Sequence, residues 1–110
     1  MIQDIEKLNY IASPDDTIEE AWTRIESNRH RSLIIVENKK VVGTLSDGDL
    51  RKAMLAKRLL STPVQEVMNM NFTSIGEDKK KIAKRILQEK DVFLLPVVDD
   101  EFNLIDIIIR

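Results

Sequence analysis

The segment Gly43–Asp49, with the sequence GTLSDGD, holds the residues of this chain best suited to ligand chemistry. Apolar residues precede it and a helix-like pattern follows, so it lies at a predicted strand-to-helix turn. The free amides of a helix start attract an anion, the Ser46 hydroxyl can donate to a phosphate, and the Asp49 carboxylate can accept from both hydroxyls of a ribose. Gly48 would let a sugar approach the backbone closely.

The same residues also have a purely structural interpretation. Ser46 and Asp49 have the spacing of a capping box, in which the Ser46 hydroxyl accepts the Asp49 amide and the Asp49 carboxylate lies in the positive field of the helix start. Such a cap needs no ligand and is compatible with binding one. The sequence therefore leaves both roles open.

Residues for catalysis or metal binding are scarce elsewhere. There is no Cys, which excludes thiol catalysis and thiolate metal sites, and the one histidine, His30, lies in a predicted solvated turn. The acidic run Asp99–Glu101 falls in a predicted hairpin turn without further ligands at suitable spacing, which favours a solvated turn over a cation site. Because a Ser/His arrangement, paired carboxylates and a phosphate-binding loop are also lacking, we expect no catalytic and no metal-binding residues.

Composition indicates a globular protein without a nucleic-acid or membrane partner. The 110 residues are 43% hydrophobic and 33% charged, which excludes disorder, and the net charge is −2. With a pI near 5.4, the chain lacks the basic character of a nucleic-acid-binding domain, and acids offset its one basic cluster, Lys79–Arg85. No apolar run is long enough to span a membrane and no signal-peptide pattern opens the chain, so we expect a cytoplasmic location.

The elements that must position the Gly43–Asp49 turn occur twice in the sequence. When the chain is shifted along itself by 62 residues, Tyr10 meets Phe72, Ala21 meets Ala83 and residues 2–5 meet residues 64–67. One extra residue in the second copy, near position 102, then changes the offset to 63. We therefore divide the chain into a first repeat, residues 1–61, and a second repeat, residues 62–110.

Each repeat is predicted to fold in the order β-α-β-β-α. The extended pieces that open the repeats are Tyr10–Ala12 and Phe72–Ile75. The apolar helix faces span Ile18–Ile25 and Ile82–Leu87, and Thr17 with Glu20 forms a capping box before the first of them. The predicted hairpin strands are Ser32–Val36 and Val41–Leu45 in the first repeat, and Phe93–Val98 and Leu104–Ile109 in the second.

A further helix, from Asp47 to about Leu60, closes the first repeat, and Thr62 and Pro63 are expected to open the next helix. The second repeat has no counterpart of the closing helix, so one face of its last strand should lie uncovered. Apolar helix faces that carry Trp22, Met54 and Leu55 should be exposed as well. We therefore expect a homodimer joined through helices.

The repeat, its element order and the turn VVGTLSDGDLRK resemble the cystathionine-β-synthase (CBS) domain pair, or Bateman module. The resemblance covers the whole chain and implies an α/β (α+β) fold of two repeats related by a pseudo-twofold axis. It is strongest to the regulatory pair of bacterial sugar-1-phosphate nucleotidyltransferases. The pair of arabinose-5-phosphate isomerases is a close second, because the sequence DGDLR occurs there too.

The resemblance also implies an adenine-nucleotide site between the repeats. Its expected residues are Thr44, Ser46, Gly48 and Asp49 in the turn, and Phe93, Leu94 and Pro96 in the strand that lines the adenine pocket. Phe93 and Leu94 stand where phosphate-binding members often carry basic residues, so AMP, ADP, ATP or adenosine should bind weakly. The second expected site is degenerate, because Ile109 replaces the counterpart of Ser46.

We therefore expect a regulatory, nucleotide-sensing pair that is not itself an enzyme and is attached to a catalytic domain outside these residues. A ligand-free dimerisation module of such an enzyme, or of a sugar-phosphate isomerase, is the alternative. A standalone CBS protein is a third interpretation, and the missing last helix argues against it.

Overall fold

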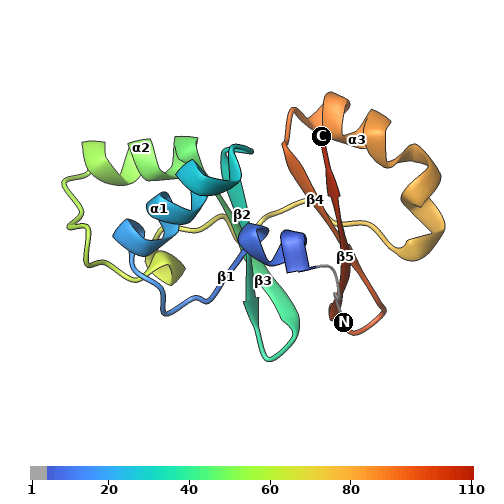
Figure 1. Ribbon diagram of the computed structural model, residues 1–110, viewed down its shortest axis with the longest axis horizontal. Helices are drawn as coiled ribbons and strands as arrows, with labels where there is room; N and C mark the ends of the chain where they lie inside the picture. Colours follow the sequence, from blue (N-terminus) through green and yellow to red (C-terminus); the bar gives the residue numbers. More distant parts are fainter. Residues whose placement is uncertain (1–4) are drawn as a thin grey trace.

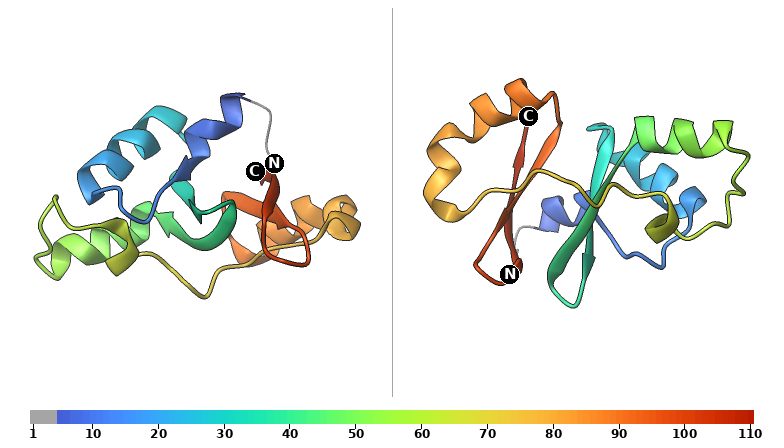
Figure 2. Two further views of the ribbon diagram at one scale, coloured as in Figure 1. Left: turned by 90° about the horizontal axis from the view of Figure 1, so that it is seen from below. Right: turned by 180° about the vertical axis from the view of Figure 1, so that it is seen from behind.

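The computed structural model describes residues 5–110 of the chain. The two sheets lie side by side in the middle of the molecule, with α1 and α2 on one flank and α3 on the other (Figures 1 and 2). The predicted correspondence of residues 2–4 with the start of the second repeat lies outside the described residues. The order of layers is therefore helices, sheet, sheet, helix.

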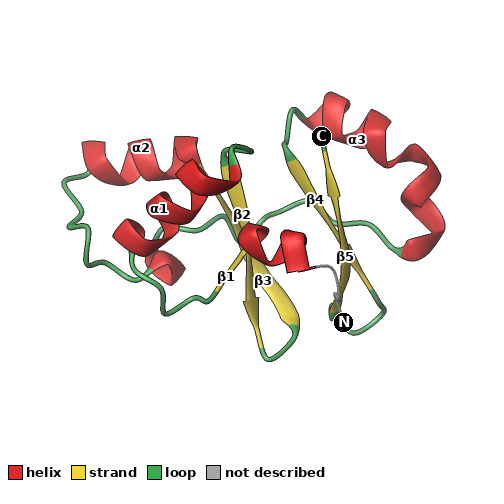
Figure 3. Ribbon diagram, viewed as in Figure 1, coloured by secondary structure: helices red, strands yellow, loops and turns green. Residues whose placement is uncertain are grey.

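The first repeat forms a three-stranded sheet covered by two helices (Figure 3). In chain order its elements are the 3-10 helix η1 (Ile5–Tyr10), β1 (Ile11–Ala12), α1 (Ile18–Asn28), β2 (Ser32–Glu37), β3 (Lys40–Ser46) and α2 (Asp47–Leu55). β2 pairs in parallel with β1 and antiparallel with β3. Ile18, Ala21 and Ile25 of α1 are buried against the sheet, as their helical spacing predicts.

The second repeat forms a two-stranded antiparallel sheet covered by one helix. Its elements are the 3-10 helices η2 (Val64–Glu66) and η3 (Glu77–Ile82), α3 (Ala83–Lys90), β4 (Leu94–Val98) and β5 (Leu104–Ile109). The predicted extended piece Phe72–Ile75 forms only an isolated bridge, between Ile75 and Val97. Ile105 and Ile108 of β5 are half-buried against the core beneath α3, so that strand face is partly covered.

The two hairpins correspond in detail. Each has a bulge at the same place, between Ile35 and Val36 and between Val97 and Val98. Beyond the bulge Val36 pairs with Val41, whereas Val98 pairs with Leu104, so the second hairpin loop is one residue longer. The predicted α+β fold is confirmed, and the extra residue lies where the sequence offset changes. The division at residue 61 stays a prediction.

The sheets meet through an apolar cluster and through their hairpin tips. The buried residues of this cluster are Ile34, Val41, Leu94, Val98, Leu104 and Ile107. At the tips the Val41 N–H donates to the Phe102 carbonyl at 3.0 Å, and the Leu104 N–H donates to the Lys39 carbonyl at 2.8 Å. The two sheets are thus joined to each other by backbone hydrogen bonds at their hairpin tips.

Helix α2 ends at Leu55, five residues before the predicted end at Leu60. Lys57 adopts the left-handed conformation with φ 63°. Its N–H bonds to the Met54 carbonyl, and the N–H of Arg58 bonds to the Ala53 carbonyl. This pattern is a Schellman motif, which usually has glycine at the left-handed position. Because lysine stands there, the usual sequence signal for the end of a helix is absent.

The predicted helix start at Thr62 and Pro63 is wrong. Only the short 3-10 helix η2 follows, Pro63 is its N-cap residue, and no side chain caps it. The Thr62 carbonyl instead accepts the Ile18 N–H at 2.9 Å, and the Val64 N–H donates to the Asp16 carbonyl at 2.8 Å. This segment is therefore held against the start of α1 by backbone hydrogen bonds.

The predicted solvated turn around His30 is correct only in part, because Arg29 and Arg31 are exposed whereas Asn28 and His30 are packed. The His30 ring is half-buried, lies edge-on to Tyr10, and places Nδ1 3.1 Å from the Tyr10 hydroxyl. Asn28 is buried, and its Nδ2 donates to the carbonyls of Asn9 and Ser32, both at 3.1 Å. These bonds satisfy the polar groups of Asn28 and His30, which explains why these two side chains are not fully solvated.

The predicted hairpin turn at residues 99–103 is present. The Asp99 carboxylate accepts the N–H groups of Glu101 and Asn103, each at 2.9 Å, and the Asn103 side chain at 3.0 Å. The bonds from Asn103 lower the pKa of Asp99. Within residues 5–110 no cluster of His, Cys, Asp and Glu has the arrangement of a metal site, and no helix is long and apolar enough to cross a membrane.

Candidate functional site

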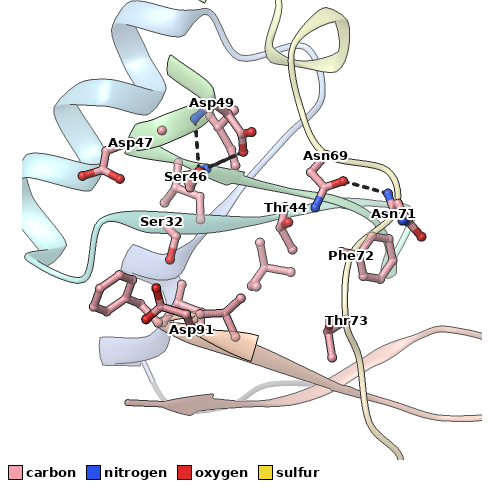
Figure 4. Close-up of a pocket in the computed structure, with 17 residues that line it drawn as sticks. Ser32, Thr44, Ser46, Asp47, Asp49, Asn69, Asn71, Phe72, Thr73 and Asp91 are labelled. Atoms are coloured by element: carbon pink, nitrogen blue, oxygen red, sulfur yellow. Dashed lines mark hydrogen bonds between the residues drawn. The ribbon is translucent and has the colours of Figure 1, made fainter. Parts of the chain in front are cut away.

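A cavity of about 290 Å³ lies between the two repeats, at the end of the strands opposite the hairpin tips. The first repeat contributes the start of β2, the end of β3 and the first turn of α2. The segments 71–73 and 91–94 complete the lining, as Figure 4 shows. The volume is close to the lower limit of small-molecule pockets.

Six of the seven predicted site residues line this cavity. Thr44, Ser46, Gly48 and Asp49 come from the first repeat, and Phe93 and Leu94 come from the second. Pro96 lies outside it: the ring is almost fully buried, and Pro96 pairs with Ile107 in the sheet. Pro96 is two residues beyond Leu94, about 7 Å further along β4, and so lies past the cavity.

Ser46 and Asp49 form the predicted capping box. The Asp49 carboxylate Oδ2 accepts the Ser46 N–H at 2.9 Å and the Ser46 hydroxyl at 3.0 Å, and the Asp49 N–H donates to Ser46 Oγ at 3.1 Å (Figure 4). Thr17 and Glu20 make the same three bonds at the start of α1, away from the cavity. The cap thus stabilises a helix in both places, and it does not by itself indicate a ligand.

The linker, residues 67–73 near the start of the second repeat, supplies cavity residues that were not predicted from the sequence. The Thr44 N–H donates to the Asn69 carbonyl at 3.0 Å, and the Asn69 N–H donates to the Thr44 carbonyl at 2.8 Å. The linker therefore runs beside β3. This pairing brings Asn71, Phe72 and Thr73 to the cavity wall. The polar run from Asn69 to Asn71 is typical of a turn, but nothing local in the sequence indicates which strand it joins.

Gly43 explains how the linker comes so close. A Cβ at this position would lie 2.7 Å from Met68 Sδ and 3.1 Å from the Asn69 carbonyl oxygen. A Cβ on Gly48 would meet its nearest neighbours, Ser46 Oγ and Arg51 Nη2, at 3.5 and 3.6 Å. The first glycine is therefore required by the fold, whereas the second is not required by packing within the protein.

The electrostatic character of the cavity comes from three carboxylates. Asp47 and Asp49 lie in the first turn of α2 and Asp91 lies across from them, and no Lys or Arg is among the described residues of the lining. The Phe93 ring lies between the guanidinium groups of Arg31 and Arg110, each 5.4 Å from its centre. These two arginines pair with the rim acids, Arg31 with Asp47 at 3.9 Å and Arg110 with Asp91 at 3.0 Å.

A second charged cluster ties η1 and η3 to β5, outside the cavity. Lys7 Nζ lies 2.7 Å from Asp106 Oδ1, and Lys80 Nζ lies 3.0 Å from Asp106 Oδ2. Burial alone would raise the pKa of Asp106, but the hydrogen bonds from the two lysines outweigh it and lower that pKa to about 2. The bond to Asp106 raises the pKa of Lys80.

The cavity combines apolar walls with hydroxyl, amide and carboxylate groups. Ile34, Leu45, Phe72, Val92 and Leu94 suit a flat apolar ring, and the Asp49 carboxylate is suited to accept from hydroxyl groups. The arrangement fits a nucleoside-like molecule held between the repeats.

This fold is that of a known family. The model of the CBS domain family matches residues 2–56. The chain belongs to the CBS domain family, and its two repeats form a CBS domain pair.

Among relatives, the chain is 31% identical over 100 residues to arabinose 5-phosphate isomerase KdsD of Francisella tularensis. The match covers 89% of this chain and 31% of that protein, so the chain spans about a third of this relative's length. The AcuB structure from Vibrio cholerae is 30% identical with a TM-score of 0.80, over 91% of this chain and 76% of that chain.

Two further solved structures share the fold and contain adenosine compounds. The CBS domain pair of protein MJ0100, in complex with 5′-methylthioadenosine and S-adenosyl-L-methionine, is 25% identical with a TM-score of 0.73, over 90% of this chain and 82% of that chain. The CBS domain protein PAE2072 from Pyrobaculum aerophilum, complexed with AMP, is 19% identical with a TM-score of 0.73, over 90% of this chain and 78% of that chain. At 19% identity the likeness to PAE2072 concerns the fold alone.

Proposed function

We propose that this CBS domain pair binds an adenosine-containing ligand in the cavity between its repeats and regulates an attached enzyme. The observation that carries the proposal is the convergence of six residues, expected from the sequence, on one cavity. They come from two segments more than forty positions apart, Thr44–Asp49 and Phe93–Leu94. The adenosine compounds in the MJ0100 structure support the ligand class.

The position of the cavity gives binding a regulatory consequence. A ligand there contacts the first turn of α2 in one repeat and the segment before β4 in the other. Its affinity therefore depends on how the repeats are placed relative to each other. A ligand that binds one placement more tightly shifts the pair toward it, and an attached domain that senses the placement responds.

The attached enzyme, in this proposal, acts on a phosphorylated sugar. KdsD, the relative named above, is an arabinose 5-phosphate isomerase, so an isomerase host has the better support. A sugar-1-phosphate nucleotidyltransferase, which the sequence favoured, is the alternative. Purified whole protein assayed for each reaction would decide between them.

We also propose that two copies associate through the helical face of the first repeat. Leu55, the last residue of α2, is 80% exposed, and in the segment that follows Leu59 is 72% and Leu60 44% exposed. Trp22 and Met54 lie half-buried on neighbouring helices and line a groove of about 470 Å³ between α1 and α2. A second copy could cover this apolar surface.

Calorimetric titration with adenosine and adenine nucleotides tests the ligand proposal, since a sensor binds at least one of them below millimolar concentration. The same ligand should raise the melting temperature, because it binds only the folded protein. If none of them binds at millimolar concentration, a ligand-free dimerisation module is the correct interpretation.

A further inference from the structure

We infer that the cavity selects an adenosine compound whose 5′ substituent is neutral or positively charged, and that it discriminates against a 5′-phosphate. The inference rests on the proposed function, because it concerns the chemistry of the same cavity. It follows from the charges around the cavity and from the hydrogen bonds already made at the start of α2.

The charges at the cavity do not favour an anion. Asp47, Asp49 and Asp91 line it, and within the described part of the chain no cationic side chain does. The arginines on the rim, Arg31 and Arg110, each pair with one of these acids and so offset two of the three charges. The carboxylate of Asp49 has no cationic partner within 4 Å among residues 5–110. A phosphate beside it would meet like-charge repulsion.

The first turn of α2 has few free hydrogen-bond donors for an anion. The Asp47 N–H already donates to the Arg31 carbonyl at 2.9 Å, and the Asp49 N–H donates to Ser46 Oγ at 3.1 Å. The Ser46 hydroxyl donates to the Asp49 carboxylate at 3.0 Å. In this turn only the Gly48 N–H has no hydrogen-bond acceptor among the described residues. The Asp49 carboxylate therefore already occupies the position at the positive end of the helix dipole that an anionic ligand would take.

Arg51 is the cation that could oppose this inference. Its Nη2 lies 3.6 Å from the position that a Cβ of Gly48 would occupy. The side chain lines the groove between α1 and α2 rather than the cavity, and it shares that groove with Arg29, Arg31 and the acids Glu26 and Asp47. Asp47 lines both the groove and the cavity, so a phosphate that reached toward Arg51 would also meet the like charge of Asp47.

The deciding experiment compares five ligands of the protein by calorimetry at low ionic strength: adenosine, 5′-methylthioadenosine, S-adenosyl-L-methionine, AMP and ATP. We expect at least one of the first three to bind ten times or more tightly than AMP and ATP. If AMP or ATP binds as tightly as the best of the three, the inference is overturned while the proposed function stands. If none of the five binds, the proposed function fails.

Two variants distinguish the effect of a charge at the cavity from the effect of the net charge of the protein. Asp91→Asn removes a rim acid and frees Arg110, and asparagine tolerates the left-handed backbone of this position, with φ 52°. We expect AMP to bind at least threefold more tightly to it and adenosine to change less than twofold. Asp100→Asn makes the same charge change in the exposed hairpin loop and should leave both affinities unchanged. Equal gains for AMP in the two variants, or no gain in Asp91→Asn, would contradict the inference.

Discussion

The Asp49 carboxylate accepts both polar hydrogens of Ser46, the backbone N–H at 2.9 Å and the hydroxyl at 3.0 Å, and it does so at the wall of a cavity between the repeats. One oxygen, Oδ2, receives both bonds. The other oxygen, Oδ1, has no hydrogen bond from the described residues, so cap and ligand site can share the same carboxylate.

Asp49→Asn should therefore affect binding more than stability. The free energy of unfolding should fall by at most about 1 kcal/mol, because asparagine keeps part of the cap. Affinity for the best-binding adenosine compound should fall at least tenfold, because a charged acceptor for the ribose hydroxyls is lost. Urea unfolding and calorimetric titration measure the two effects.

The chain contains a matched control for this variant. Glu20→Gln makes the equivalent change in the capping box of α1, which has the same three hydrogen bonds and lies away from the cavity. It should have a similar effect on stability and none on affinity. A loss of affinity in both variants would show that binding responds only to stability.

The two glycines near the turn should respond oppositely to alanine. Gly43→Ala should destabilise the fold by about 1–3 kcal/mol, since its Cβ would lie 2.7 Å from Met68 Sδ and close to the linker backbone. Gly48→Ala should be neutral or stabilise α2 by up to about 1 kcal/mol. It should nevertheless weaken ligand binding, because a methyl group is added at the cavity wall. Unchanged affinity in Gly48→Ala would argue against a ligand close to this turn.

The Asp106 cluster should make stability depend on acid pH. The pKa of Asp106 is about 2 in the folded protein, below its ordinary value of 3.8. Its contribution is present above the unfolded-state pKa and is lost as the pH falls through about 2. Asp106→Asn should lower the free energy of unfolding at pH 7 by about 1–2 kcal/mol, allowing for partial solvent screening.

The same variant should also show a smaller loss of stability between about pH 4 and pH 2 than the unmodified protein. Asp100→Asn, in an exposed loop, is the control and should follow the unmodified protein. Parallel pH curves for Asp106→Asn and the unmodified protein would contradict the role given to the two lysines.

Association should depend on Leu55. Leu55→Glu places a charge in the centre of the proposed interface and should convert a dimer into a monomer at concentrations of tens of micromolar, as measured by light scattering. Met70→Glu changes a side chain that is 73% exposed on the linker and should leave the mass unchanged. A monomeric unmodified protein at high micromolar concentration would rule out the proposed dimer.

Much of this fold could be predicted because its signals are local or repeated. Ile18, Ala21 and Ile25 recur at helical spacing and are buried, and Leu104–Ile109 was predicted with the bounds that the structure shows. The end of α2 could not be predicted, because a lysine rather than a glycine adopts the left-handed conformation that stops it. Such a stop depends on backbone hydrogen bonds that the residue types do not specify.

The same distinction applies to the site. Ser46 and Asp49 were predictable because their three-residue spacing has a defined geometry at a helix start. Phe72 and Thr73 were not predicted, because they reach the cavity only through the pairing of the linker with β3. Asp91 was not predicted either, since its position depends on how the second repeat packs against the first.

The hairpin tips and the cavity lie at opposite ends of the same strands, so we expect a change in the angle between the hairpins at their tips to be amplified at the cavity. β2 and β3 are six and seven residues long, or about 20 Å. With the Val41–Phe102 and Leu104–Lys39 hydrogen bonds as a fixed pivot, a rotation of about 5° moves the far ends of the strands by about 2 Å over that length. The helices attached at those far ends move with them, so the width of the cavity and the spacing between the outer helices change together.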